Sequence, residues 1–304
     1  MELLRHVVPP DARPTVVGRY LKGRLGLSGT LIRRLKMAEG VILNGEPVWA
    51  DHPIGPGDEL QLVLTPREAT GVDPEPVPLD IVYEDDDLIV LNKPAGLVVH
   101  PTKGCYHGTL ANGLAYYYRE KGLTLGMHPV HRIDRHTSGL VLFAKHSMAH
   151  QRLDEQLRAH KLDRRYVSLV WGQVAADSGR IDRPIGLVEG HPVAREVAEG
   201  GQPSVTDFEV VARYPEPAPW GCTLLRLTLQ TGRTHQIRVH MASEGHPLVG
   251  DDLYSKDYPP ALGRQALHAA TLAFNHPRTG EPCRFEVPLP DDFRDWLAGL
   301  NHGD

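Results

Sequence analysis

The sequence has few cysteines, and their positions exclude two classes of protein. Its three cysteines, Cys105, Cys222 and Cys283, lie far apart, and no Cys-x-x-Cys pair occurs. A disulfide-stabilised secreted domain and a zinc ribbon both need a denser, more regular pattern. The chain also lacks an apolar leader at its N-terminus, and its apolar run at residues 140–144 is far too short to cross a bilayer. We therefore expect a soluble protein of the reducing cytoplasm with no membrane partner.

Acidic residues are missing from one long segment, although the chain as a whole is acidic. Its formal net charge is -5 at pH 7, which alone argues weakly against a nucleic-acid partner. Residues 12–38 nevertheless contain no Asp or Glu, and their bases are Arg13, Arg19, Lys22, Arg24, Arg33, Arg34 and Lys36. A local basic face attracts polyanions whatever the net charge. We interpret Arg33, Arg34 and Lys36 as nucleic-acid contacts; a solvated helix face is the alternative.

Turn-forming residues divide the chain into three parts. The 26 prolines and 30 glycines indicate a loop-rich, mostly β architecture. Residues 14–64 read as a small module, with two helical patterns, Ser28 as a cap of the second, a hairpin at Asn44-Gly45 and a final strand. Residues 65–79 contain four prolines and no periodicity, which is typical of a linker. Residues 80–304 form the main domain.

Several elements of the main domain follow from hydrophobic periodicity. We expect two strands within residues 80–101, a helix over 109–122, a buried strand at 140–144 and a strand over 165–174. The charged segment 148–160 predicts an exposed helix, which we place beside the functional site. Residues 222–245 pass from an alternating strand through a Gly turn into a helix.

One carboxylate, Asp134, lies among basic side chains in the segment HPVHRIDRHTSGLVLFAKH. Arg132 and Arg135 flank it, and two histidines lie within three residues of it. Neighbouring cations favour the ionised form of a carboxylate, and active sites are where such groups collect. We interpret Asp134 as a carboxylate held ready for chemistry; an Asp that pairs with Arg or forms a turn for structural reasons is the alternative.

Two further polar segments interrupt apolar strands. TGRTHQIRVH, at residues 231–240, carries Arg233, His235 and Arg238, and RRYVSLVWG, at 164–172, carries Tyr166 behind two arginines. Three polar clusters separated by buried strands indicate one shared cleft. The histidine pairs 128/131 and 235/240 raise the possibility of a metal. Because Pro129 interrupts the first pair, and neither pair has Cys or carboxylate ligands clustered with it, we predict no metal site.

HRIDRHTSGLVLFAKH resembles the catalytic motif of RluA-type RNA pseudouridine synthases, His-Arg-Leu-Asp followed by two variable residues and Thr-Ser-Gly. The segments 83–101, 164–172 and 231–254 resemble the other motifs of that family, in its order. Four matches in order are far more specific than any one of them. Ile133 replaces the usual Leu, and Arg164 stands where Lys is common. The N-terminal module is similar to the S-four-type RNA-binding module, first seen in a small-subunit ribosomal protein.

The resemblance implies that the chain converts uridine in RNA into pseudouridine without a cofactor. It implies that Asp134 is the catalytic carboxylate, acting by attack at C6, by attack at C1′ or through a glycal. Arg238 is the implied partner of Asp134, and Arg233 is the second choice. Tyr166 would lie against the uracil ring.

Other residues are implied to contact RNA. Arg132 would fill the space left by the extruded base or bind phosphate. Arg233 and His235 complete the contacts expected near the site. Large-subunit ribosomal RNA is the expected substrate and transfer RNA the second choice, and we expect a monomer. A non-catalytic RNA-binding ribosome-assembly factor is the alternative of another class, and a metal-dependent hydrolase is a distant third.

The resemblance also implies the fold class, which is α+β. The catalytic domain, residues 80–304, would be a mostly antiparallel mixed sheet with flanking helices and a cleft across one face. The small α/β RNA-binding module would precede it on the Pro-rich linker and move as a separate body.

Overall fold

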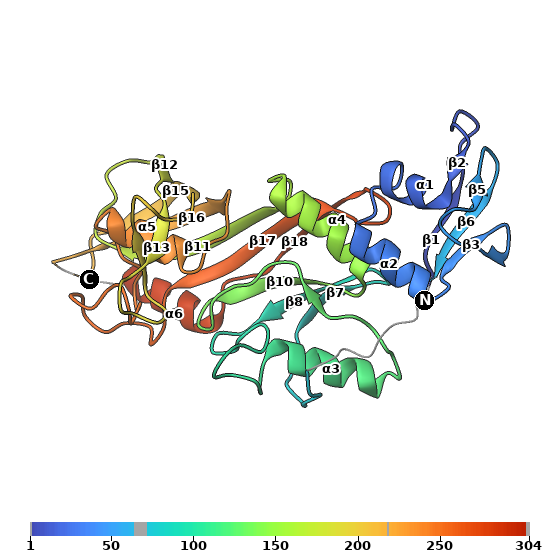
Figure 1. Cartoon of the computed structure of the whole chain (residues 1–304). Helices are drawn as coiled ribbons and strands as arrows, with labels where there is room; N and C mark the ends of the chain where they lie inside the picture. Colours follow the sequence, from blue (N-terminus) through green and yellow to red (C-terminus); the bar gives the residue numbers. More distant parts are fainter. Residues whose placement is uncertain (1, 64–71, 218, 302–304) are drawn as a thin grey trace.

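The computed structural model describes residues 2–63, 72–217 and 219–301. A four-stranded sheet lies at one end of an elongated molecule, and a ten-stranded sheet extends towards the other end (Figure 1). The expected linker, residues 65–79, lies partly outside the described residues; its described part, 72–79, forms neither helix nor strand. Among the described helices, none has the length and apolar character that crossing a membrane requires.

The N-terminal unit consists of short elements around one small core. Its elements are β1 (Glu2–Val7), β2 (Thr15–Val16), α1 (Val17–Gly23), α2 (Gly29–Met37), β3 (Val41–Leu43), β4 (Glu46–Pro47), β5 (Pro53–Ile54) and β6 (Glu59–Val63). As predicted, Ser28 caps α2 by accepting the Leu31 backbone N–H, and Asn44-Gly45 turns the β3–β4 hairpin. The expected start at residue 14 is too late, because β1 pairs with β6 along its length.

Helix α4 (Ser147–Arg158) lies between the N-terminal unit and the large sheet (Figure 1). Its Met148 packs into the core of the N-terminal unit, and Gln151 accepts a hydrogen bond from the Ser28 backbone N–H and donates one to the Gly26 carbonyl. Our placement of this helix beside the site is wrong. In the described part of the chain its residues line neither cavity around Asp134. Its charged face indicated exposure, but its apolar face covers the sheet.

The large sheet follows the order β12 (Ser178–Asp182), β15 (Val205–Tyr214), β16 (Cys222–Leu229), β11 (Asp163–Trp171), β17 (Leu267–Asn275), β10 (Ser138–Ala144), β8 (Leu88–Lys93) and β7 (Ile81–Glu84). β18 (Pro282–Glu286) also pairs with β17, and β9 (His128–Pro129) with β10. Within the described strands only β10 and β17 pair in parallel. The prediction of a mostly antiparallel mixed sheet with flanking helices is therefore confirmed.

The close approach of β10 and β17 explains the glycine of the Thr-Ser-Gly segment. Gly139 lies opposite Ala269 with φ +109°, and a Cβ atom there would lie 2.3 Å from the Ala269 carbonyl oxygen. An L side chain fits neither that dihedral nor that space. Gly139 thereby lets β10 begin directly after the Asp134 loop.

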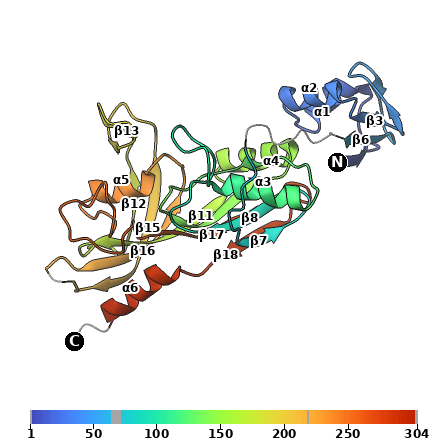
Figure 2. The ribbon, with the colours of Figure 1, turned by 90° about the horizontal axis from the view of Figure 1, so that it is seen from below.

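Helices cover both faces of the part of the large sheet that β8 and β10 form. Alternate residues of these strands point to opposite faces. One face packs against α3 (Leu110–Glu120) and α5 (Gln236–Ser243), and the other against α4. α6 (Asp291–Asn301) covers a further apolar cluster through Phe293. The hairpin of β13 (Ile185–Leu187) and β14 (Arg195–Val197) rises beside α5 (Figure 2).

Candidate active site

Two cavities meet at Asp134. The narrower one measures ≈ 70 Å³ and the wider one ≈ 690 Å³. Both are lined by Arg132, Ile133, Asp134, His235 and Arg238. The narrower cavity adds residues from β11 and from the 231–237 segment, so the three polar segments do share one cleft, as their spacing predicted.

The nitrogen atoms that contact Asp134 come from a distant segment. Its side chain is 20% exposed, with Arg238 Nη1 at 3.5 Å and His235 Nε2 at 4.0 Å from Oδ2. Among the described side chains, neither Arg132 nor Arg135 forms an ion pair with it, although these two suggested a charged site in the sequence. Arg135 instead donates from Nε to the Gly96 carbonyl.

The strongest partner of Arg238 is Asp251, which the sequence analysis did not single out. The Asp251 carboxylate is fully buried and accepts two hydrogen bonds, from Arg238 Nε at 2.6 Å and Nη2 at 2.8 Å. Burial works against the charge of the guanidinium, but Asp251 and Asp134 together hold the pKa of Arg238 above its ordinary value. Asp251 follows Gly250 in the last motif, and the signal that could have found it is the pair of adjacent acids, Asp251 and Asp252, after the apolar residues Leu248 and Val249.

Tyr166 and Arg164 extend from β11 towards the narrower cavity. Tyr166 is buried, and burial raises the pKa of its hydroxyl, with Arg164 acting against that shift and Asp134 adding to it. Arg164 is also buried and donates from Nη2 to the Thr231 carbonyl at 3.2 Å. A Cβ at Gly232 would lie 2.7 Å from Arg164 Nη1, so the turn fits closely over this arginine.

Gln236 holds the turn that carries Arg233. Its buried amide oxygen accepts from the Arg233 backbone N–H at 2.9 Å and from the Thr231 hydroxyl at 2.8 Å. The Arg233 side chain is exposed at the rim of the narrower cavity. Arg132, which lines both cavities, is exposed as well. The site thus carries guanidinium groups at its mouth and a carboxylate inside.

Lys93 supports the Asp134 loop from beneath. Its buried ammonium donates to the carbonyls of Pro94, Leu97 and Arg135 at 2.8–2.9 Å. Burial lowers the pKa of Lys93 to about 7, while the charge of Asp134 acts in the opposite direction. Lys93 therefore ties the end of β8 to the residue after Asp134.

The basic residues of α2 lie outside this cleft. Arg33 and Lys36 are exposed, and Arg34 is half-buried. Burial lowers the pKa of His128 to about 4, and the charges of His150 and Arg34 add to the shift. Arg34 is less exposed than Arg33 and Lys36, and its charge acts on His128, so the three residues do not form one evenly exposed face.

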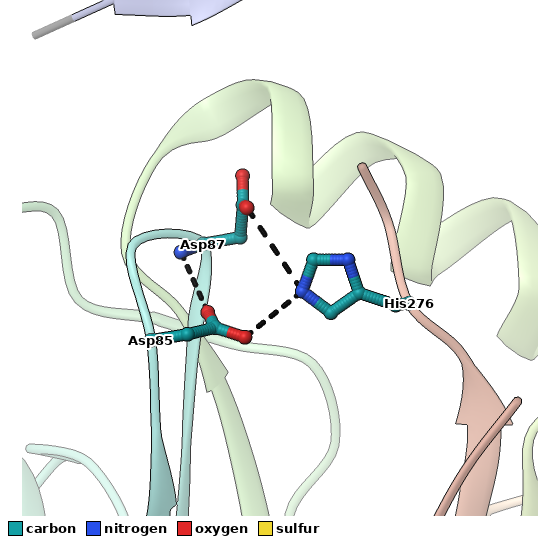
Figure 3. A group of neighbouring side chains, drawn as sticks. All are labelled: Asp85, Asp87 and His276. Atoms are coloured by element: carbon teal, nitrogen blue, oxygen red, sulfur yellow. Dashed lines mark hydrogen bonds and ion pairs between the residues drawn. The ribbon is translucent and has the colours of Figure 1, made fainter. Parts of the chain in front are cut away.

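Within the described residues, one group with metal-ligand chemistry occurs, and it lies away from the histidine pairs for which we predicted no metal site. Asp85 and Asp87 follow β7, and His276 follows β17; their oxygen and nitrogen atoms converge (Figure 3). Protein donors already occupy these atoms. Arg278 makes two hydrogen bonds to Asp87, at 2.7 and 2.9 Å, and His146 makes a third at 2.8 Å. A guanidinium against the carboxylate competes with any cation, so we assign this group to an ion network that joins the two turns.

Comparison with known proteins identifies the family. A family model described as RNA pseudouridylate synthase matches residues 87–243, from the start of β8 to the end of α5. YlyB of Bacillus subtilis (strain 168), an uncharacterised RNA pseudouridine synthase, is 44% identical over 263 residues, which cover 86% of this chain and 85% of the relative. The chain belongs to the RNA pseudouridylate synthase family.

Other relatives agree with this assignment. Ribosomal large subunit pseudouridine synthase D of Neisseria meningitidis serogroup A is 41% identical over 273 residues, covering 86% of this chain and 71% of the relative. The structure of human RNA Pseudouridylate Synthase Domain Containing 1 superposes with a TM-score of 0.58 at 28% identity, covering 71% of this chain and 85% of that one. As an RNA pseudouridylate synthase, the chain is an isomerase that acts on RNA, which confirms the activity predicted from the four motifs.

Proposed function

We propose that this pseudouridine synthase modifies large-subunit ribosomal RNA and that Asp134 performs the chemistry without a cofactor. The observation that carries the proposal is the position of Asp134. Among the described residues it is the only acid that lines the narrower cavity, and Arg238 from a distant segment lies 3.5 Å away. The relative named ribosomal large subunit pseudouridine synthase D, at 41% identity, supports the ribosomal substrate.

The isomerisation needs no redox partner. The bond from C1′ to N1 breaks, a bond from C1′ to C5 forms, C5 loses a proton and N1 gains one. Asp134 attacks C6, attacks C1′ or helps to remove a ribose proton, and each route requires it as a carboxylate. Arg238 balances its charge, and Asp251 holds Arg238 in place by two hydrogen bonds. Tyr166, in the same cavity, packs against the uracil ring.

The exposed arginines at the cavity mouth suit an RNA backbone. A uridine in structured RNA must leave its stack before an enzyme can reach C1′ and C5, at a cost of a few kcal/mol. Arg132 and Arg233 contact the phosphates on either side of the extruded nucleotide, and Arg132 can also occupy the vacated stack. His235, which lies deeper, contacts the nucleotide within the cavity.

Replacing Asp134 by Asn tests the catalytic assignment. We expect the D134N variant to release no tritium from large-subunit ribosomal RNA labelled at C5 of uridine, with RNA affinity near that of the wild type, because one neutralised acid removes no phosphate contact. Asp252, which lines the wider cavity but is 82% exposed, provides the matched control, and D252N should remain active. Turnover by D134N would refute the mechanism and favour a role as a binding protein.

Mapping pseudouridines at nucleotide resolution, with and without the protein, tests the choice of substrate. A loss of pseudouridine confined to large-subunit ribosomal RNA is the expected result. A loss confined to transfer RNA would leave the activity intact but overturn the proposed substrate.

The N-terminal unit is proposed to be an S-four-type RNA-binding module, followed by a catalytic domain over residues 80–304. Two exposed basic residues of α2, Arg33 and Lys36, support this assignment. Trp49, which lies near Lys36 and is 65% exposed, supports it as well. Exposed cations and an aromatic ring are the usual means of holding RNA phosphates and unpaired bases.

Salt dependence tests the module. In the R33Q/K36Q variant, the slope of log affinity against log salt should become shallower by about 1.5, since each lost phosphate contact removes roughly 0.7–0.9. The D134N variant is the control and should keep the wild-type slope. An unchanged slope in R33Q/K36Q would place α2 away from the RNA.

A further inference from the structure

His235 occupies a strained position at the centre of the site. It is the residue before α5, and its backbone is left-handed, with φ 59° and ψ 18°. That conformation is unfavourable for a non-glycine residue, and such strained residues collect at functional sites. Its ring is 13% exposed, lines both cavities and brings Nε2 to 4.0 Å from Asp134 Oδ2.

The Tyr254 hydroxyl is the hydrogen-bond partner of His235 Nδ1, the other nitrogen of that ring. The Tyr254 hydroxyl lies 3.0 Å from His235 Nδ1 and 2.9 Å from the backbone nitrogen of Arg195 in β14. A backbone N–H can only donate, so the hydroxyl oxygen accepts there. The hydroxyl oxygen has a second lone pair, but among the described residues His235 Nδ1 is the one acceptor in hydrogen-bond contact with the hydroxyl, so donation to Nδ1 satisfies both groups. Burial raises the pKa of Tyr254, so its proton stays in place at neutral pH.

The tautomer of His235 follows from this pairing. Burial lowers the pKa of His235, with Asp134 acting against the shift, so the ring is neutral at pH 7. A neutral imidazole that accepts at Nδ1 carries its proton on Nε2. That N–H faces Asp134. The opposite tautomer would direct a lone pair towards the carboxylate, which is repulsive.

We propose that Tyr254 is a positioning residue for the reaction: its hydroxyl holds His235 as the Nε2–H tautomer and so directs a neutral donor towards Asp134. This inference rests on the proposed role of Asp134. A neutral donor stabilises the charge of a nearby carboxylate without protonating it, whereas an imidazolium could transfer its proton. The same hydroxyl also joins the site to the β13–β14 hairpin through the Arg195 N–H.

Nitrogen-15 NMR of the full-length protein, labelled in histidine, tests the tautomer directly. The His235 signals are assigned by their absence in His235→Asn. In the wild type we expect a protonated Nε2 and an unprotonated Nδ1. Tyr254→Phe keeps the aromatic ring, which lies 5.0 Å from the Arg238 guanidinium, and removes only the hydroxyl. This variant should lose the preference for the Nε2–H form.

Tritium release from labelled ribosomal RNA tests the consequence. Y254F should lower kcat about tenfold, the equivalent of one lost hydrogen bond, and leave KM within about twofold. H235N/Y254F should be no slower than H235N alone, because Tyr254 acts through His235. Tyr258→Phe is the matched control: that ring stacks on Trp171 and, among the described residues, lines neither cavity.

Three results would overturn the inference. They are a wild-type His235 protonated on Nδ1, a Y254F variant that changes tautomer but keeps its kcat, and a full additional loss of rate when Y254F is added to H235N. The last result would assign the hydroxyl to anchoring the hairpin. Failure of the proposed function would give a different result. In that case D134N would be active, while the nitrogen-15 signals of His235 would still show the expected tautomer.

Discussion

Asp251 takes no part in the proposed reaction, yet replacing it by Asn should reduce both stability and rate. Among such non-reacting acids we expect this change to have the largest effect on the site. Asp251 is fully buried and makes both short hydrogen bonds to Arg238, whose side chain is only 6% exposed. A pair of unit charges about 4 Å apart attracts by ~4 kcal/mol at an effective dielectric constant of ~20. Removing one member of a buried pair costs about 3–5 kcal/mol, because the other charge stays buried. Since Asn keeps one acceptor, we expect D251N to lose about 3 kcal/mol of unfolding free energy.

The same change should reduce the rate. With Asp251 neutral, Asp134 and Asp252 remain 3.5 Å from Arg238, and the guanidinium turns towards Asp134, which is 20% exposed against 82% for Asp252. A closer ion pair makes the carboxylate less available, so kcat should fall more than tenfold with RNA affinity retained. D252N is the matched control, because Asp252 also lies 3.5 Å from Arg238 but is 82% exposed. Exposed pairs contribute about 0–1 kcal/mol.

Urea unfolding with linear extrapolation measures the stability, and tritium release under conditions where each variant is folded measures kcat. Equal stability of D251N and D252N, within about 0.5 kcal/mol, would show that the buried charge pair does not hold the site together. A D251N variant with normal kcat would separate the Asp251–Arg238 pair from catalysis.

Two further predictions concern stability. Burial lowers the pKa of His128 to about 4 and that of His131 to about 3, whereas unfolded histidine titrates near 6.5. Between these values the unfolded state binds more protons than the folded state. The free energy of unfolding should therefore fall as the pH drops from about 6.5 to 4, by up to ~1.4 kcal/mol per pH unit for each histidine. Urea midpoints at pH 7 and pH 5 measure this, and equal midpoints would contradict it. Gly139→Ala should cost about 3 kcal/mol, because its Cβ would lie 2.3 Å from the Ala269 carbonyl oxygen at φ +109°. Gly23→Ala, where a Cβ meets nothing within 4 Å, is the control in the same thermal unfolding assay and should be neutral or stabilising.

Elements with strong local patterns were predictable from the sequence. Ser28 precedes a run of apolar residues at helical spacing and does cap α2, and Asn44-Gly45 does form the hairpin turn. β8 and β10 were recognised as strands because both their faces are buried and their sequences are almost wholly apolar. Each of these signals lies within a few residues of the structure it specifies.

Features that depend on distant pairing were missed or misplaced. β1 has no strong strand pattern, and its place in the sheet comes from β6, more than fifty residues later. The surroundings of α4 depend on the N-terminal core, into which Met148 inserts. Among the described residues, the arginines next to Asp134 in the sequence form no ion pair with it, and its partner Arg238, at 3.5 Å, was predicted only through the family resemblance.

The amino-acid order by itself determined which groups this enzyme has for its chemistry. The four motifs, read in sequence, predicted the family and the activity and named Asp134 as the proposed catalytic carboxylate, because residue identity and short-range spacing carry that information. Only the tertiary structure decided which of these side chains contact one another. The Asp251 carboxylate on Arg238 and the Tyr254 hydroxyl on His235 are contacts of a few ångströms, and such contacts exist only after separate strands and turns have packed against each other.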